Sequence, residues 1–246
     1  MAHETRETVT SPKVAICCPT GDHVAAMWAH DFARMLGHTI RHRPDIDLLH
    51  LMMPGSLIAK QREALVLEVL KEAPDYTHVL WLDTDMRFPP ETLLGLLARQ
   101  KRIVAGNYVE RRPPFRPVAF PELRRANTRL FSRPEDKGLE EIEAVGFGCV
   151  LIELDVFKSL PRPWFCVGWV KETQEHVGED VFFCETARRN GEHIWLDHDL
   201  SQHIGHVGTL EFTMTHSLAY HSATPNGNGH DGPVPVTERS LELVKP

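Results

Sequence analysis

Two carboxylates one residue apart, Asp83 and Asp85, follow directly on a short apolar run at residues 78–82. Alternate side chains of an extended strand point to the same face, so both carboxylates can be directed at one cation or one polyol. Oxygen ligands of this kind suit a hard divalent metal ion. Short acidic side chains could instead end the strand in a turn by accepting backbone hydrogen bonds. The Asp-Thr-Asp segment is therefore the first candidate for a functional site.

Two downstream groups of side chains could also do chemistry. Gly178-Glu179-Asp180 places two acids in the first turn of an expected helix. There they either complement the helix dipole or, in a cleft, supply a general base for an attacking hydroxyl. His203 and His206 lie in a glycine-flanked segment after the last expected strand. An imidazole can complete the coordination of a metal such as Mn²⁺ that a carboxylate already holds.

The composition limits the classes of protein to which these residues can belong. The chain has 246 residues, 42% of them hydrophobic, which is enough for the core of one globular domain. A net charge of −7 disfavours generic binding to nucleic acid or to an anionic membrane. The sequence has no apolar run long enough to span a bilayer, and residues 1–13 lack the apolar region of a signal peptide. Five scattered cysteines without a CxxC pair argue against a disulfide framework, so we expect a cytoplasmic protein.

Strand-like and helix-like segments alternate along the chain, which predicts an α/β fold with a mostly parallel central sheet flanked by helices. Ligands of such sheets bind beyond the carboxyl ends of the strands, where Thr20 and the Asp-Thr-Asp segment would lie. Ser56 is expected to cap the second helix. The expected strands are 14–18, 46–53, 78–82, 102–108, an ordered stretch at 142–154, and 193–196, and the expected helices are 24–37, 56–71, 91–100, a short one to about 159, and 179–189.

We expect one domain over residues 13–222, between an N-terminal tail, 1–12, and a flexible tail, 223–246, rich in Asn, Gly, Pro and Ser. The alternating pattern is lost between residues 110 and 138, which predicts a long loop or a small β insertion. This stretch is locally basic and is either a solvated loop or a flap that contacts a polyanion. Its arginines are Arg111, Arg112, Arg116, Arg124, Arg125, Arg129 and Arg133.

The motifs, taken in order, resemble the GT-A class of nucleotide-sugar glycosyltransferases, such as family 2-like members. They are the strand ending in Asp-Thr-Asp, Gly146-Phe147-Gly148 before a helix, Gly-Glu-Asp-x-x-Phe at 178–183, and Gly-His-x-Gly at 205–208. The resemblance covers roughly residues 13–208. It implies a single Rossmann-like GT-A domain that binds Mn²⁺ or Mg²⁺ and a nucleoside-diphosphate sugar, with a UDP-sugar as the expected donor.

The resemblance also implies roles for individual residues. Asp85 would bind the metal directly, Asp83 would contact the ribose or the metal, and His206 would be the third protein ligand, with His203 as the alternative. Asp180 matches the base of inverting members, and Glu179 matches a residue that contacts the acceptor or the donor sugar. The nucleotide and its diphosphate would be held by Pro19, Thr20, Arg62, Asp83 and Gly148.

The expected reaction is therefore metal-dependent transfer of a sugar to a hydroxyl acceptor. The basic stretch allows that acceptor to be polyanionic, such as DNA with a hydroxylated base or a phosphate-rich glycan. Two alternatives remain open. One is a phosphatase of the haloacid-dehalogenase type with Asp83 as nucleophile, although Met86-Arg87-Phe88 stands where those proteins carry Gly-Thr-type residues. The other is a non-catalytic module that binds a nucleotide sugar or a glycan.

Overall fold

The computed structural model describes residues 11–112, 114–123, 128–170, 175–208 and 214. The expected domain end at 222, the tail 223–246 and residues 1–10 of the expected N-terminal tail lie outside these ranges. Arg124 and Arg125 of the basic stretch lie outside them as well.

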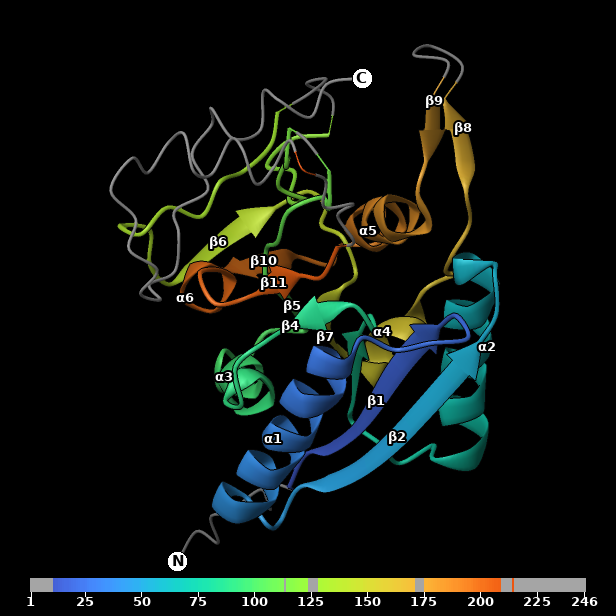
Figure 1. Cartoon of the computed structure of the whole chain (residues 1–246). Coiled ribbons are helices and arrows are strands. Elements are labelled where there is room, and N and C mark those ends of the chain that lie inside the picture. The colour runs from blue at the N-terminus through green and yellow to red at the C-terminus, as the bar shows by residue number, and fades with distance from the viewer. Residues whose placement is uncertain (1–10, 113, 124–127, 171–174, 209–213, 215–246) are drawn as a thin grey trace, which may run out of the picture.

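The described residues form a central seven-stranded sheet with helices on both faces (Figure 1). Five strands run in one direction, and β6 and β7 run in the other. The predicted α/β fold with a mostly parallel sheet is confirmed. In spatial order the strands are β2 (Asp47–Pro54), β1 (Lys13–Thr20), β3 (His78–Leu82), β7 (Cys149–Glu153), β5 (Ile103–Ala105), β10 (Ile194–Asp197) and β6 (Leu139–Ile142).

Alternating side chains of the sheet build a separate core on each face. In β1, Val14, Ile16 and Cys18 point to one face, while Ala15 and Cys17 point to the other, as the two-residue period of a strand requires. Helices α1 (Ala26–His42) and α3 (Thr92–Ala98) pack on the first face, and α2 (Ile58–Glu72), α4 (Leu154–Ser159) and α5 (Glu179–Arg189) pack on the second. Strands buried on both faces explain the continuous apolar runs of the sequence.

Two short strands bring residues 205–206 beside the Asp-Thr-Asp segment at 83–85, called the acidic motif below. Strand β11 (Gly205–His206) pairs antiparallel with β4 (Met86–Arg87), which places His206 opposite Met86. The backbone N–H of Val207 donates to the carbonyl oxygen of Asp85 at 2.7 Å. A second two-stranded unit, β8 (Gly168–Val170) with β9 (Glu175–Val177), precedes α5 and projects from the body of the fold (Figure 1).

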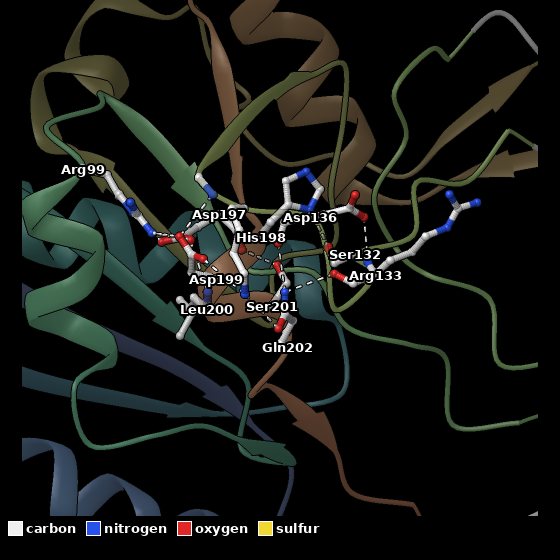
Figure 2. Close-up of polar contacts among 12 residues, drawn as sticks. Arg99, Ser132, Arg133, Asp136, Asp197, His198, Asp199, Leu200, Ser201 and Gln202 are labelled. Atoms are coloured by element: carbon white, nitrogen blue, oxygen red, sulfur yellow. Dashed lines mark hydrogen bonds and ion pairs between the residues drawn. The ribbon is translucent and has the colours of Figure 1, made fainter.

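A polar cluster on the short helix α6 (His198–Ser201) holds the chain that leads into β11 (Figure 2). Arg99 donates to both carboxylate oxygens of Asp197, at 2.7 and 2.8 Å. The buried ring of His198 is hydrogen-bonded to the Ser132 hydroxyl at 2.9 Å. Gln202 donates to two carbonyl oxygens of the adjacent loop at 3.0 and 3.1 Å. These bonds fasten the end of the basic stretch to α6 and so fix the path of the chain toward His206.

The structure corrects two local predictions. The second helix begins at Ile58 with Leu57 at its cap position and no side-chain cap, so the prediction that Ser56 caps it is wrong. The strand expected over 102–108 ends at Ala105. Gly106 follows it, where a Cβ would lie 2.1 Å from Ile204. The described part of the basic stretch contains no strand, and only Pro117 and Phe120 take part in isolated β-bridges, with Val109 and Ala144. Of the two expectations, it therefore matches the long loop.

None of the helices in the described part of the chain is long and apolar enough to cross a bilayer.

Aromatic rings pack beneath helix α5, which carries Glu179 and Asp180 in its first turn. The ring of Phe183 is fully buried, and its centroid lies 5.2 Å from Phe147, 5.3 Å from Phe157 and 5.4 Å from Phe165. Interlocking rings of this kind add attraction beyond the apolar area that they bury. The position of Glu179 and Asp180 at the start of α5 therefore depends on this cluster.

Replacing Phe183 with alanine should lower the free energy of unfolding by about 3–5 kcal/mol, because it leaves a cavity among three packed rings. Urea denaturation followed by circular dichroism would measure the change. Phe131→Ala is the matched control, since that ring is 59% exposed and its loss should change stability by at most about 0.5 kcal/mol. Equal losses in the two variants would contradict the assignment of Phe183 to the core.

Candidate active site

A cavity of about 300 Å³ opens beyond the carboxyl ends of β1 and β3, where a ligand site was predicted. The acidic motif forms one side of it, and the ends of β1 and β2 with the first turn of α2 form another. The lining residues are Pro19, Thr20, Gly21, Gly55, Ser56, Ile58, Gln61, Asp83, Thr84, Asp85 and Arg111. Of the predicted site residues, Pro19, Thr20, Asp83 and Asp85 therefore share one cavity.

Arg62 of α2 is the buried cation of this region, with its side chain 2% exposed. Its Nη2 donates to the two carboxylate oxygens of Asp83 at 2.9 and 3.2 Å, and its Nε donates to Glu179 at 3.2 Å. The guanidinium also lies over the rings of Trp81 and Phe147, 5.2 and 5.5 Å from their centroids. Burial alone would lower the pKa of Arg62, but the charges of Asp83 and Glu179 outweigh it and the pKa is raised.

Arg62 was predicted to hold the diphosphate, and that role stays a prediction. In the structure it ties the end of β3 to the start of α5 through two carboxylates. The third guanidinium nitrogen, Nη1, is buried and has no hydrogen-bond partner among the described residues. Burial also raises the pKa of Asp83, because the neighbouring Arg62 charge only partly compensates the loss of water.

Gly148, predicted as a nucleotide-binding residue, lies behind the acidic motif. Its carbonyl oxygen accepts a hydrogen bond from the backbone N–H of Asp83 at 3.1 Å, and its own N–H donates to the hydroxyl of Tyr108 at 3.1 Å. A Cβ at this position would lie 2.8 Å from both Tyr108 and the sulfur of Met86. Glycine is therefore required for Tyr108 to pack against the strand end.

Asp85 meets His206 and an arginine. The Oδ2 of Asp85 lies 2.7 Å from Nη1 of Arg111 and 3.5 Å from Nε2 of His206. Burial alone would raise the pKa of Asp85, but these partners outweigh it and the pKa is lowered. The Nδ1 of His206 lies 2.9 Å from the carbonyl oxygen of Val109, which can only accept, so this nitrogen carries the proton. His203, the alternative ligand, is exposed, and it is His206 that lies beside Asp85.

The residues around Asp85 fit a divalent cation with two protein ligands. A histidine that donates one ring nitrogen to a backbone carbonyl keeps the other free for a metal, which is the orientation of His206 toward Asp85. One carboxylate plus substrate phosphates and water is a usual set for such an ion. Both oxygens of Asp83 accept hydrogen bonds from Arg62, and its contact with a metal or the ribose stays a prediction. No group of three or more metal-ligating side chains occurs within the described residues.

Asp180 and Glu179 occupy the first turn of α5, as predicted. They do not line the cavity but are joined to it through Arg62 and Asp83. The carboxylate of Asp180 folds back over Gly178, where a Cβ would lie 2.6 Å from its oxygen. Burial, reinforced by the charge of Glu179, raises the pKa of Asp180 to about 6. A carboxyl poised in this way can accept a proton near neutral pH.

Polar residues that were not singled out from the sequence hold the predicted Thr20. Its hydroxyl lies 3.1 Å from that of Thr84, the middle residue of the acidic motif. Gln61 donates to the carbonyl oxygens of Thr20 and Met53 at 2.7 and 2.6 Å, which joins the ends of β1 and β2. The alternation rule could have marked Thr84 as facing away from Asp83, but Gln61 carries no sequence signal.

Some arginines of the basic stretch are used within the fold. Arg111 pairs with Asp85. Arg129 donates to the carbonyl oxygen of Pro117 at 3.1 Å and lies over the ring of Phe120. Three more of the described arginines are exposed, namely Arg112, Arg116 and Arg133.

Comparison with known proteins gives likeness of structure but not of sequence. No family model matches the chain, and no curated protein sequence matches it. The A197 protein from STIV is similar over 82% of this chain and 98% of its own, with 14% identity and a TM-score of 0.47. The catalytic domain of Drosophila beta1,4galactosyltransferase 7, solved with xylobiose, is similar over 80% of this chain and 71% of its own, with 13% identity and a TM-score of 0.49.

A glycosyltransferase involved in the glycosylation of the major capsid of PBCV-1 is similar over 62% of this chain and 70% of its own, with 10% identity and a TM-score of 0.34. Glycosyltransferases are thus among the structural neighbours, as the resemblance of the motifs predicted.

Replacing Arg62 with methionine should lower the free energy of unfolding by about 3 kcal/mol, because Asp83 and Glu179 would be left without a counter-charge. Adding Asp83→Asn to this variant should recover part of the loss. Urea denaturation of the three proteins would give the values.

Arg43→Ala is the matched control, since it removes an exposed pair with Asp45 and should have a much smaller effect. If Arg62→Met were as stable as the control, the two carboxylates would not depend on the buried guanidinium.

Proposed function

We propose that the protein is a metal-dependent glycosyltransferase that moves a sugar from a nucleoside-diphosphate sugar to a hydroxyl acceptor. The observation that carries this proposal is the meeting of Asp85 and His206 beside a cavity at the carboxyl ends of β1 and β3. One residue comes from the middle of the chain and the other from the end of its described part. Their side chains offer the oxygen and nitrogen that Mn²⁺ accepts.

In this proposal the chain's own residues position the donor and take the acceptor proton. Thr20 and Asp83 face the cavity that would receive the nucleotide. The acceptor oxygen attacks the anomeric carbon as the bond from that carbon to the diphosphate breaks, and the carboxylate of Asp180 accepts the hydroxyl proton. A divalent cation at Asp85 and His206 would neutralise charge on the departing diphosphate. Attack on the face opposite the leaving group inverts the anomeric centre.

The phosphatase alternative needs Asp83 as a free nucleophile. Both oxygens of that carboxylate accept hydrogen bonds from Arg62, which lowers its nucleophilicity and fixes its orientation. The non-catalytic alternative keeps the cavity but predicts no turnover. Release of nucleoside diphosphate from a nucleotide sugar distinguishes both alternatives from sugar transfer.

The identity of the donor as a UDP-sugar, the polyanionic acceptor and the cytoplasmic location all stay predictions. Within the described residues, Arg112 and Arg116 are exposed and form no ion pair of the kind that Arg111 and Arg129 form, so they are the positions at which a polyanionic acceptor would bind. A contact with phosphates would make acceptor binding weaken steeply with salt.

Incubation with a panel of nucleotide sugars and Mn²⁺ should release nucleoside diphosphate slowly, with water as acceptor. Asp85→Ala should abolish this release because it removes the carboxylate ligand. Asp22→Ala, a change at an exposed position beyond the cavity lining, is the matched control and should behave as the wild type. Release that persists in EDTA, or in Asp85→Ala, would contradict the metal role.

The rate of sugar transfer at low substrate should rise with pH and level off above about pH 6, because Asp180 must be ionised to accept a proton. Asp180→Asn should lower the rate by about 10²–10⁴-fold and remove this rise. A pH profile of kcat/KM for both proteins would measure it.

The same raised pKa means that ionising Asp180 opposes folding. The contribution of Asp180 to the free energy of unfolding therefore declines as pH rises from 3.8 to about 6. Asp180→Asn should raise the Tm relative to wild type at about pH 8 but hardly at about pH 4. In the kinetic experiment, an unchanged pH profile of kcat/KM in Asp180→Asn would assign the base to another residue.

A further inference from the structure

Among the described residues, Arg111 is the nearest cation to Asp85, although its side chain is 52% exposed. Its Nη1 lies 2.7 Å from Oδ2 of Asp85, while Nε2 of His206 lies 3.5 Å from the same oxygen. Arg111 also lines the cavity. A guanidinium and an imidazole are therefore both directed at the one carboxylate oxygen that would bind a metal.

Gly208 packs beside Arg111. A Cβ on Gly208 would lie 3.4 Å from the Cβ of Arg111 and 3.5 Å from its carbonyl oxygen. Val207, the residue before this glycine, is bonded through its N–H to the carbonyl oxygen of Asp85. The Gly-His-x-Gly segment thus brings His206 to Asp85 and places Gly208 against the stem of Arg111.

We propose that Arg111 is a resident counter-cation of Asp85 that a divalent cation must displace, so that this arginine sets the metal affinity of the site. The inference rests on the proposed function, because it takes Asp85 and His206 as the metal ligands. A guanidinium 2.7 Å from the carboxylate oxygen repels a second cation at the same carboxylate, so metal binding competes with this ion pair. The exposed position of Arg111 on a loop permits its displacement.

Mn²⁺ binding in the absence of nucleotide tests this directly. Free Mn²⁺ would be titrated by its electron paramagnetic resonance signal against the wild type, Arg111→Ala, Arg111→Lys and Arg112→Ala at neutral pH. Arg111→Ala should bind Mn²⁺ with a Kd on the order of tenfold lower than wild type, because the competing charge is gone. Arg111→Lys, which keeps the charge, and Arg112→Ala, which alters an exposed neighbour, should stay close to wild type.

An equal or weaker affinity in Arg111→Ala would overturn the proposal, as would equal gains in Arg111→Ala and Arg112→Ala or no Mn²⁺ binding by any of the four proteins. Circular dichroism would confirm that each variant is folded. Donor hydrolysis is read separately. If the donor is hydrolysed but Arg111→Ala binds Mn²⁺ no more tightly than wild type, this inference is wrong and the proposed function stands. If Arg111→Ala binds Mn²⁺ more tightly but the donor is not hydrolysed, the proposed function is wrong and the role of Arg111 in metal affinity stands.

Discussion

The guanidinium of Arg62 is the charge around which the rest of the site is arranged. A buried cation is tolerated only when carboxylates pair with it, and Asp83 and Glu179 supply that pairing from β3 and α5. The two acidic motifs, nearly a hundred residues apart in sequence, are held together by this one side chain. Its aromatic neighbours Trp81 and Phe147 leave little room for it to move, so Asp83 is fixed in direction.

Because Arg62 holds Asp83, the two aspartates of the Asp-Thr-Asp segment have different roles in the proposed site. Asp83 is paired with a buried permanent charge, and in the proposed reaction Asp85 is the carboxylate that exchanges its partner. The β4–β11 ladder then brings His206 to Asp85, and the hydrogen bond to Val109 orients its ring. In the proposed reaction one acid therefore maintains the architecture, while the other binds the ion that the chemistry needs.

Much of the fold followed from local pattern. The run at 78–82 and the helix at 179–189 have the predicted bounds, because a continuous apolar run and a helix stopped by Asn190-Gly191 are strong local signals. The reversed β7 was not foreseen, since strand direction depends on the path of the basic stretch before it. The pairing of Arg62 was not foreseen either, because a helical arginine looks the same in sequence whether it is exposed or buried.

The assignment of Asp85, and not Asp83, to the exchangeable cation is tested most directly by pulsed electron paramagnetic resonance of bound Mn²⁺. The account predicts coupling to one histidine nitrogen in the wild type. This coupling should persist in His203→Ala, vanish in His206→Ala, and give way to loss of bound Mn²⁺ in Asp85→Ala, while Asp83→Asn still binds the ion. Retention of Mn²⁺ in Asp85→Ala together with its loss in Asp83→Asn would contradict the account.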